Sequence, residues 1–237
     1  MSEQQLFSDS PMAYFMPDAV LFKTADGLFK PLSYRSFISL FSTVTVHTPL
    51  LPPGTRYYAS TGTIERVVFE LPPSRRVLTF KCVSHDGSWH AYNVPLPTLL
   101  AVCTLSGGRL RDFSVFATFT FPSTPTTRLY HCPLPNVDRA GHVCFGAVSV
   151  PRILSVSDAA RLLDAFLSSP FNFDYVDHVV EWGARLPSSA PPALLSALLG
   201  RDCLGMYAAL QDCDTFPPEL LVSDSRTMAD LMDGGSF

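Results

Sequence analysis

Residues 130–146 read YHCPLPNVDRAGHVCFG, and this stretch guides the interpretation of the whole chain. His, Cys, Asn and Asp side chains are concentrated here between prolines and glycines. The stretch follows neither the two-residue period of a strand nor the 3.6-residue period of a helix. It therefore predicts an ordered, irregular loop, which is where binding and catalytic side chains are commonly found.

Strand-like segments precede this loop. They are rich in Val, Phe and Thr with partial alternation, and they lie at Ile64–Leu71, Arg76–Val83, Trp89–Val94 and Asp112–Phe121. Turn sequences separate the segments and leave little room for crossover helices; among them are Pro72-Pro73-Ser74 and Asp86-Gly87. The pattern predicts an antiparallel meander, with Leu96–Thr104 as a short helix between the third and fourth strands.

Helices are predicted after the loop. Ser157-Asp158 can cap the first of them, and Ser168-Ser169-Pro170 ends it. A second helix begins at Pro191-Pro192 and ends at Leu199-Gly200, with a leucine stripe that we assign to packing. Strands followed by helices predict an α+β fold.

The composition of the chain excludes some classes of binding partner. With 47% hydrophobic and 16% charged residues, the 237-residue chain can bury a sizeable core. A net charge of -4 and scattered Lys and Arg residues give no continuous basic surface, so nucleic acid is not expected as the primary partner. The sequence shows no signal peptide or membrane span. We therefore expect a cytoplasmic protein, with no membrane partner, whose six cysteines remain thiols.

The loop resembles the active-site segment of ubiquitin-conjugating enzymes. That family carries a His-Pro-Asn segment, then an irregular turn with Gly, an aliphatic residue and the catalytic cysteine. Pro135, Asn136, Gly141, Val143 and Cys144 stand in that order here, with the family's Asn-to-Cys spacing. The sequence departs from the motif one residue before Pro135, where it has leucine in place of histidine.

A bacterial branch of that family resembles more of the chain. This branch includes the PRTRC system protein B group and related conjugating enzymes encoded beside ubiquitin-like, activating and deubiquitinase-like proteins. The similar segments are Gly87–Pro95, Leu129–His131, Phe166–Asn172 and Phe216–Val222. The resemblance implies a ubiquitin-conjugating-enzyme-like fold, an antiparallel meander of about four strands packed by helices. Residues 1–60 would form an N-terminal extension packed on the core, and residues 61–237 the domain with its C-terminal helices.

The resemblance also implies an activity. A ubiquitin-like protein would pass from an activating enzyme to Cys144 as a thioester, and then to an amine on a target. The expected partners are the ubiquitin-like protein, the activating enzyme and a deubiquitinase-like protease from the same operon. The setting would be a plasmid system or antiphage defence. No metal or other cofactor is implied, because the activating enzyme consumes the ATP.

Five residues beside Cys144 receive roles from the resemblance. Asn136 would donate a hydrogen bond to the oxyanion that forms when the amine attacks, although an Asx turn that holds the loop explains it equally well. His131 matches the Tyr-His pair of the bacterial branch; it would bond the loop or act on the incoming amine. Tyr130, Pro135 and Gly141 would shape the loop.

Other interpretations of the reactive residues stay open. Cys144 could be a small buried hydrophobic residue, as Cys82, Cys103 and Cys132 are expected to be. The protein could be a non-catalytic adaptor of the same fold, or a cysteine hydrolase that uses His131 or His142. His142 is otherwise a bystander, which strand alternation brings to the same face as Cys144. The spacing of His131, Cys132, His142 and Cys144 matches no known zinc ribbon or finger, so we assign no metal site.

Overall fold

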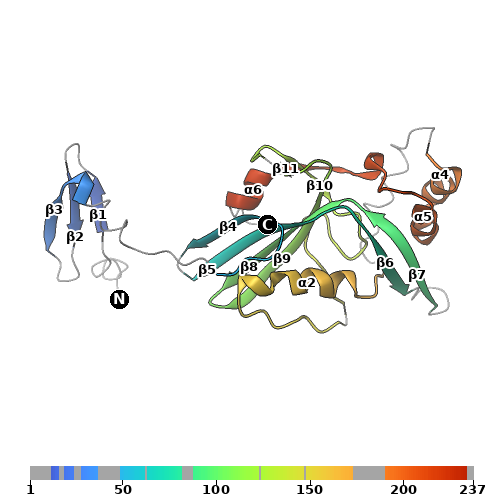
Figure 1. The fold of residues 1–237 in the computed structure, drawn as a ribbon, viewed down its shortest axis with the longest axis horizontal. Helices are drawn as coiled ribbons and strands as arrows, with labels where there is room; N and C mark the ends of the chain where they lie inside the picture. Colours follow the sequence, from blue (N-terminus) through green and yellow to red (C-terminus); the bar gives the residue numbers. More distant parts are fainter. Residues whose placement is uncertain are drawn as a thin grey trace, which may run out of the picture. The chain divides into compact units, whose positions relative to one another are not determined.

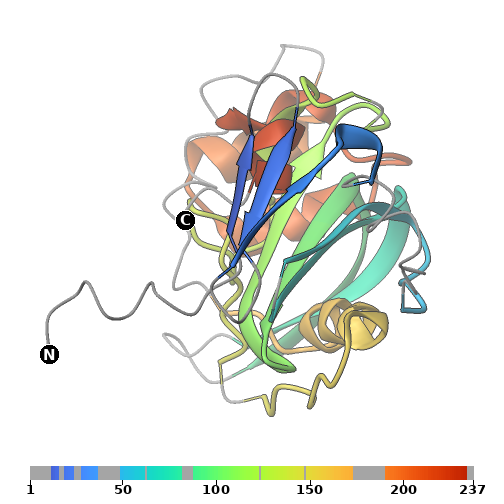
Figure 2. The ribbon, with the colours of Figure 1, turned by 90° about the vertical axis from the view of Figure 1, so that its left-hand side faces the viewer.

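The computed structural model describes residues 12–15, 19–23, 28–36, 49–61, 63–81, 88–122, 124–146, 148–172 and 190–233. The chain divides into two compact units, residues 1–48 and 49–237. In the first unit, β1 (Met12–Phe15), β2 (Val20–Lys23) and β3 (Phe29–Leu32) form an antiparallel sheet. Figure 2 shows these strands side by side in one layer.

The second unit is built on a six-stranded antiparallel sheet with the order β11-β10-β9-β8-β5-β4. Its strands are β4 (Thr55–Thr61), β5 (Ile64–Leu71), β8 (Thr98–Ser106), β9 (Arg109–Thr118), β10 (Arg128–His131) and β11 (Ser223–Thr227). Residues 55–60 lie in the predicted N-terminal extension, yet they form most of β4, which pairs with Ile64 to Phe69 of β5. The sheet of the second unit therefore begins before residue 61.

Strands β6 (Ser74–Lys81) and β7 (Trp89–Leu96) form a separate antiparallel pair that continues β5 and β8. Leu71 pairs with Leu99, and Ser74 pairs with Leu96, so the register passes unbroken across Pro72-Pro73 and Pro97. Proline has no backbone N–H to donate to a ladder, and these prolines interrupt the sheet hydrogen bonds. The result is one long hairpin that bends at its prolines, with β6 and β7 curving away from the main sheet (Figure 1).

The predicted helix at Leu96–Thr104 is wrong, because this segment forms most of β8. Leu99, Ala101 and Cys103 face the larger apolar cluster, whereas Leu100 and Val102 face a smaller cluster on the opposite side of the sheet. A strand buried on both faces has no polar alternation to distinguish it from a helix. β8 lies between β5 and β9, so the meander does not follow the four strands read from the sequence.

Helices cover both faces of the sheet. The helical elements are η2 (Val156–Asp158), α2 (Ala159–Leu167), α4 (Pro192–Leu199), α5 (Cys203–Leu210), η4 (Pro218–Leu220) and α6 (Met228–Asp233). Side chains of α2 join the larger cluster and those of α6 the smaller one, on opposite sides of the sheet (Figure 1). The helices predicted after Ser157 and after Pro191 are confirmed, and the fold is α+β.

Some predicted features fall outside the described residues, namely Cys82 and the Asp86-Gly87 turn. In the part of the chain that the structure describes, no helix is both long enough and apolar enough to cross a membrane.

Candidate active-site loop around Cys144

The segment from Asn136 to Cys144 forms a small hairpin, here called the Cys144 hairpin. Val137 and Val143 pair across it as an antiparallel bridge. The backbone N–H of Cys144 donates to the Asn136 carbonyl at 2.8 Å. The predicted irregular loop is therefore an ordered two-armed structure, with Cys144 at the end of its second arm.

A tight turn joins the two arms. The Gly141 N–H donates to the Asp138 carbonyl at 3.0 Å, and the His142 N–H donates to Asp138 Oδ1 at 2.9 Å. Asp first and Gly fourth is a common sequence for a type I turn. Gly141 has φ +95°, and a Cβ at this position would lie 2.5 Å from the Phe116 ring. The turn therefore requires glycine both for its backbone conformation and for space.

The second arm of the hairpin pairs with β9. Val115 N–H donates to the Gly141 carbonyl at 2.8 Å, and Val143 N–H donates to the Phe113 carbonyl at 3.2 Å. Strand β10 uses the next part of the same β9 edge, where Tyr130 pairs with Ala117. The outer edge of β9 is thus shared between β10 and the Cys144 hairpin.

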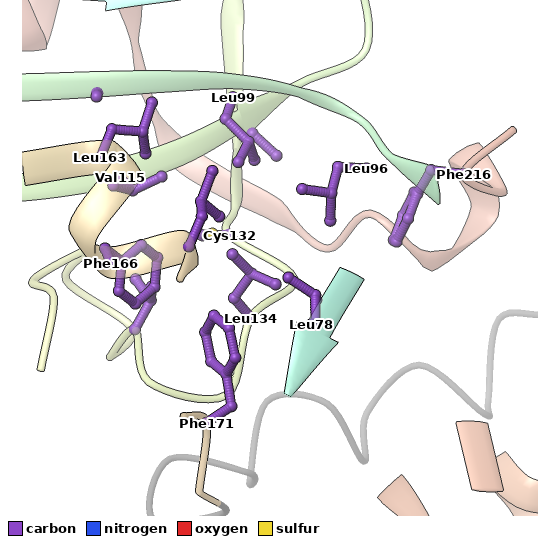
Figure 3. Packing of buried hydrophobic residues seen from close by; sticks show 14 of the residues in the cluster. Leu78, Leu96, Leu99, Val115, Cys132, Leu134, Leu163, Phe166, Phe171 and Phe216 are labelled. Carbon is purple, nitrogen blue, oxygen red and sulfur yellow. The ribbon is translucent and has the colours of Figure 1, made fainter. Parts of the chain in front are cut away.

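The chain enters the hairpin through buried residues. Leu134, at the position of the family's histidine, is fully buried and points into the same apolar cluster as Leu78 and Phe171 (Figure 3). Pro135 is buried beside it. The Tyr207 hydroxyl of α5 donates to the Pro133 carbonyl at 2.8 Å. Apolar burial and this hydrogen bond hold the loop at the point where the family motif has histidine.

The Asn136 side chain ties the hairpin to the segment that follows α2. It is only 2% exposed. Its Nδ2 lies 3.5 Å from the Pro170 carbonyl oxygen, and its Oδ1 accepts from the Asn172 N–H at 3.0 Å. Phe171, between these two residues, exchanges backbone hydrogen bonds with β6, since its N–H donates to Thr79 at 2.7 Å. The amide thus bonds a distant segment, and among the described residues it makes no local Asx turn.

His131 lies on β10 and faces Asp224 of β11. Its Nδ1 is 3.4 Å from Asp224 Oδ2, without the geometry of a hydrogen bond, so the contact is electrostatic when the ring is protonated. Burial tends to raise the pKa of Asp224, but hydrogen bonds from Arg226 outweigh it and lower that pKa below its ordinary value. Tyr130 precedes His131 on β10 and is partly buried against the larger cluster.

His142 lies between two carboxylates. Its Nδ1 is 3.2 Å from Asp138 Oδ2, and its Nε2 is 3.7 Å from Asp112 Oδ1; the side chain is 40% exposed. His131 likewise faces an aspartate. A hydrolase would need an imidazole bonded to the thiol, and in the described part of the chain both candidate rings approach carboxylates instead.

The described cysteines differ in exposure. Cys103 and Cys132 are buried, whereas Cys144, Cys203 and Cys213 are partly exposed. Burial raises the pKa of the Cys103 thiol to about 12 and that of Cys203 to about 11, and it also raises the pKa of Cys132 and of Cys213. Such thiols form little thiolate at neutral pH. Cys144 shares its partial exposure with Cys203 and Cys213, but it lies at the end of an ordered hairpin, where a nucleophile is expected.

No group of three or more His, Cys, Asp or Glu side chains suited to hold a metal ion occurs within the described ranges. The four residues weighed for zinc, His131, Cys132, His142 and Cys144, do not form such a group. Cys132 in particular is buried in the apolar cluster (Figure 3).

Three residues that hold the loop were not predicted from the sequence: Tyr207, Asp224 and Arg226. Their contacts reach residues far away along the chain, with separations of 74 for Tyr207 to Pro133 and 86 for Arg226 to Ala140. The spacing of residues within one segment of the sequence does not indicate contacts between residues so far apart. A tyrosine within a mostly apolar helix, such as Tyr207 in α5, indicates only a core residue.

Comparison with known proteins identifies a family. The model of prokaryotic E2 family D matches residues 56–199, which include β4 from its second residue, β5 to β10, the Cys144 hairpin, α2 and α4. No curated protein and no solved structure gives a significant match. Because the family match covers more than half of the chain, the protein belongs to prokaryotic E2 family D and is a bacterial relative of the ubiquitin-conjugating enzymes.

Proposed function

We propose that this protein is a conjugating enzyme that carries a ubiquitin-like protein as a thioester on Cys144. Membership of the family indicates a role in ubiquitin-like conjugation, with a ubiquitin-like protein and an activating enzyme as partners. The observation that carries the residue assignment is the position of Cys144. It is a partly exposed thiol at the end of a hydrogen-bonded hairpin, whereas Cys103 and Cys132 are buried and the partly exposed Cys203 and Cys213 lie in and after helix α5.

The proposed reaction has two transfers. The Cys144 thiolate attacks the carbonyl carbon of the thioester on the activating enzyme; a new S–C bond forms and the activating enzyme's thiolate leaves. An amine of the target then attacks the same carbon. A C–N bond forms, the Cys144 thiolate leaves, and the amine loses its proton to solvent or to a base. Each transfer passes through a tetrahedral oxyanion that hydrogen-bond donors stabilise.

Asn136 supports this reaction chiefly through position. One N–H of its amide faces Pro170, which leaves the second N–H as the candidate donor to the oxyanion. Its oxygen accepts from Asn172 and holds the amide in place. Tyr130, Pro135 and Gly141 would keep the surrounding loop in shape, and His131 would act from β10, where it faces Asp224.

The test is adduct formation. The purified protein is incubated with ATP and with the activating enzyme and ubiquitin-like protein encoded beside it, and wild type, Cys144→Ala and Cys144→Ser are run on non-reducing gels. We expect a reductant-sensitive adduct with wild type, none with alanine, and a reductant-resistant oxyester with serine. Cys213→Ala is the matched control and should form the adduct, because Cys213 lies in a different part of the fold.

A non-catalytic adaptor of the same fold is the second candidate. The observation that favours it is the buried Leu134, which replaces the family's histidine. This candidate predicts that wild type binds the ubiquitin-like protein without forming an adduct, and that Cys144→Ala binds it equally well in calorimetry. An adduct that depends on Cys144 would exclude it.

A further inference from the structure

Strand β11 lies beyond the residues that the family model matches, yet it contacts the Cys144 hairpin. The Arg226 guanidinium donates from Nη1 to the Ala140 carbonyl at 2.8 Å and from Nη2 to the Arg139 carbonyl at 3.1 Å. Both carbonyls belong to the turn between the two arms of the hairpin. A single side chain from the C-terminal strand therefore bonds two successive peptide groups of the turn.

Asp224 fixes the direction of the Arg226 side chain. Arg226 Nε donates to Asp224 Oδ1 at 2.9 Å and Nη2 donates to Oδ2 at 2.6 Å, a bidentate pair. The Asp224 side chain is only 3% exposed. Bidentate pairs of this kind restrict the planar guanidinium to one orientation, which a lysine ammonium cannot reproduce. The pairing with Asp224 thus directs other N–H groups of the Arg226 guanidinium toward the turn.

The same guanidinium lies against the ring beneath the turn. Its central carbon is 4.6 Å from the centroid of the Phe116 ring. This is also the ring that a Cβ on Gly141 would meet. Phe116 thus contacts both Arg226 and Gly141, and the pair, the ring and the turn form one contiguous group of contacts.

A hairpin with two short arms needs such contacts. Two-stranded hairpins by themselves are only marginally stable in water. Strand β9 holds the second arm of the Cys144 hairpin through Val115 and Phe113. Arg226 bonds two carbonyls of the turn itself.

We propose that Asp224 and Arg226 are positioning residues that hold the turn at Arg139 and Ala140 and thereby fix the position of Cys144. Only the catalytic consequence rests on the proposed function. A thiol held in one orientation reaches its reaction partners without first losing conformational freedom, and small displacements of reacting groups lower rates strongly. The first consequence is structural and is measured without any partner protein.

The experiment measures hydrogen exchange at the amides of Gly141, His142 and Cys144, all of which donate hydrogen bonds within the hairpin. The full-length proteins compared are wild type, Arg226→Met, Arg226→Lys and Asp224→Asn. Arg161→Ala is the matched control, since Arg161 makes an exposed 3.5 Å pair with Asp158 at the start of α2. Amides of β5 and β8 report on the stability of the whole domain.

We expect exchange in the hairpin to accelerate about tenfold or more in Arg226→Met and Asp224→Asn, because hydrogen bonds to charged groups are lost. Arg226→Lys should give an intermediate rate, and Arg161→Ala the wild-type rate. Amides of β5 and β8 should be unchanged in all variants. The rate of Cys144 alkylation by iodoacetamide, followed by mass spectrometry of its peptide, should change in the same variants.

Two results would overturn the proposal: wild-type exchange in the hairpin of Arg226→Met, or equal acceleration in the hairpin, β5 and β8, which would show only a general stabilising role. The catalytic consequence is measured as discharge of the Cys144 thioester to hydroxylamine, which should slow in Arg226→Met. If wild type forms no thioester while the exchange results hold, the proposed function fails and the positioning role stands.

Discussion

At the scale of single residues, Gly141 is the position of the hairpin with the least tolerance for a side chain. We predict that Gly141→Ala lowers the free energy of unfolding by about 1–3 kcal/mol, the usual cost of a residue held in an unfavourable backbone conformation, plus the cost of displacing the Phe116 ring. Urea denaturation measures it.

Gly108→Ala separates the two causes. Gly108 also has a positive φ, +70°, but the nearest atom to a Cβ there is the Leu154 carbonyl oxygen at 3.9 Å. Only the backbone cost applies to this variant. Equal losses of stability in the two variants would show that the Phe116 ring moves freely and that the contact is unimportant.

The second prediction concerns how the stabilising effect of the Asp224 carboxylate depends on pH. Its pKa in the folded protein is lowered by Arg226 despite burial, so the carboxylate stabilises the fold above the ordinary value of about 3.9. That contribution is lost as the pH falls through the ordinary value toward the lower folded value. The difference in unfolding free energy between wild type and Asp224→Asn should therefore be present well above pH 4 and shrink below about pH 4.

Urea denaturation of both proteins between pH 3 and pH 7 measures this difference. Asp230, whose pKa is lowered by hydrogen bonds from Thr227, is present in both proteins and cancels in the comparison. A difference that stays constant over the whole range would mean that the Asp224 carboxylate does not stabilise the fold.

At this scale the sequence offers candidates for only part of the proposed site. The resemblance to ubiquitin-conjugating enzymes indicates Cys144, Asn136 and Gly141, which lie within nine residues on one loop, where the Cys144 N–H bonds the Asn136 carbonyl. Arg226 and Tyr207 could not be found in this way. Their role depends on which strands and helices the fold brings together, and one Arg or Tyr on a strand or helix has many possible partners.

At the scale of elements, the hydrophobic pattern predicts several strands and helices correctly, but it predicts a helix where the structure has strand β8. The helix at Ala159–Leu167 follows its period, since its buried side chains Ala159, Leu162, Leu163 and Phe166 lie on one face. Strand β8 does not, because both of its faces are covered, by α2 on one side and α6 on the other. Its strand conformation follows from its pairing with the neighbouring strands β5 and β9, which the sequence of the segment does not show.

The prediction at this scale concerns the contact between helix α5 and the loop before the Cys144 hairpin. Tyr207→Phe removes the hydroxyl that donates to the buried Pro133 carbonyl and leaves that acceptor without its partner. We expect a loss of about 1–3 kcal/mol in unfolding free energy and faster hydrogen exchange in the Cys144 hairpin.

Tyr57→Phe is the control, because Tyr57 packs only partly buried against the smaller cluster. It should change the free energy of unfolding by less than Tyr207→Phe. If the two variants behave alike, the hydroxyl of Tyr207 does not hold the loop and its ring alone matters.

At the scale of the whole molecule, the division between residues 48 and 49 predicts where the chain can be cut. Both apolar clusters consist of residues from Leu51 onward. We predict that residues 49–237 fold alone and unfold in one cooperative transition by circular dichroism. A fragment of residues 62–237, which lacks β4, should melt at a lower temperature, because the edge of β5 and the contacts of Tyr57 and Tyr58 are lost.

A broad, non-cooperative transition of residues 49–237 would contradict this boundary. Equal melting temperatures for the two fragments would instead place the boundary at residue 61, where the sequence resemblance first suggested it.

The contacts that hold the Cys144 hairpin also determine when it forms. Arg226 and Ala140 are 86 residues apart in the chain, and Tyr207 and Pro133 are 74 apart. Contacts between such distant residues carry a large loop-closure entropy, so they form after the local hairpins of the sheet. During folding, the β8–β9 hairpin can exist while the turn at Arg139 and Ala140 is still unsupported. The thiol therefore reaches its final position among the last events of folding, and a chain that stops short of β11 would carry Cys144 without presenting it.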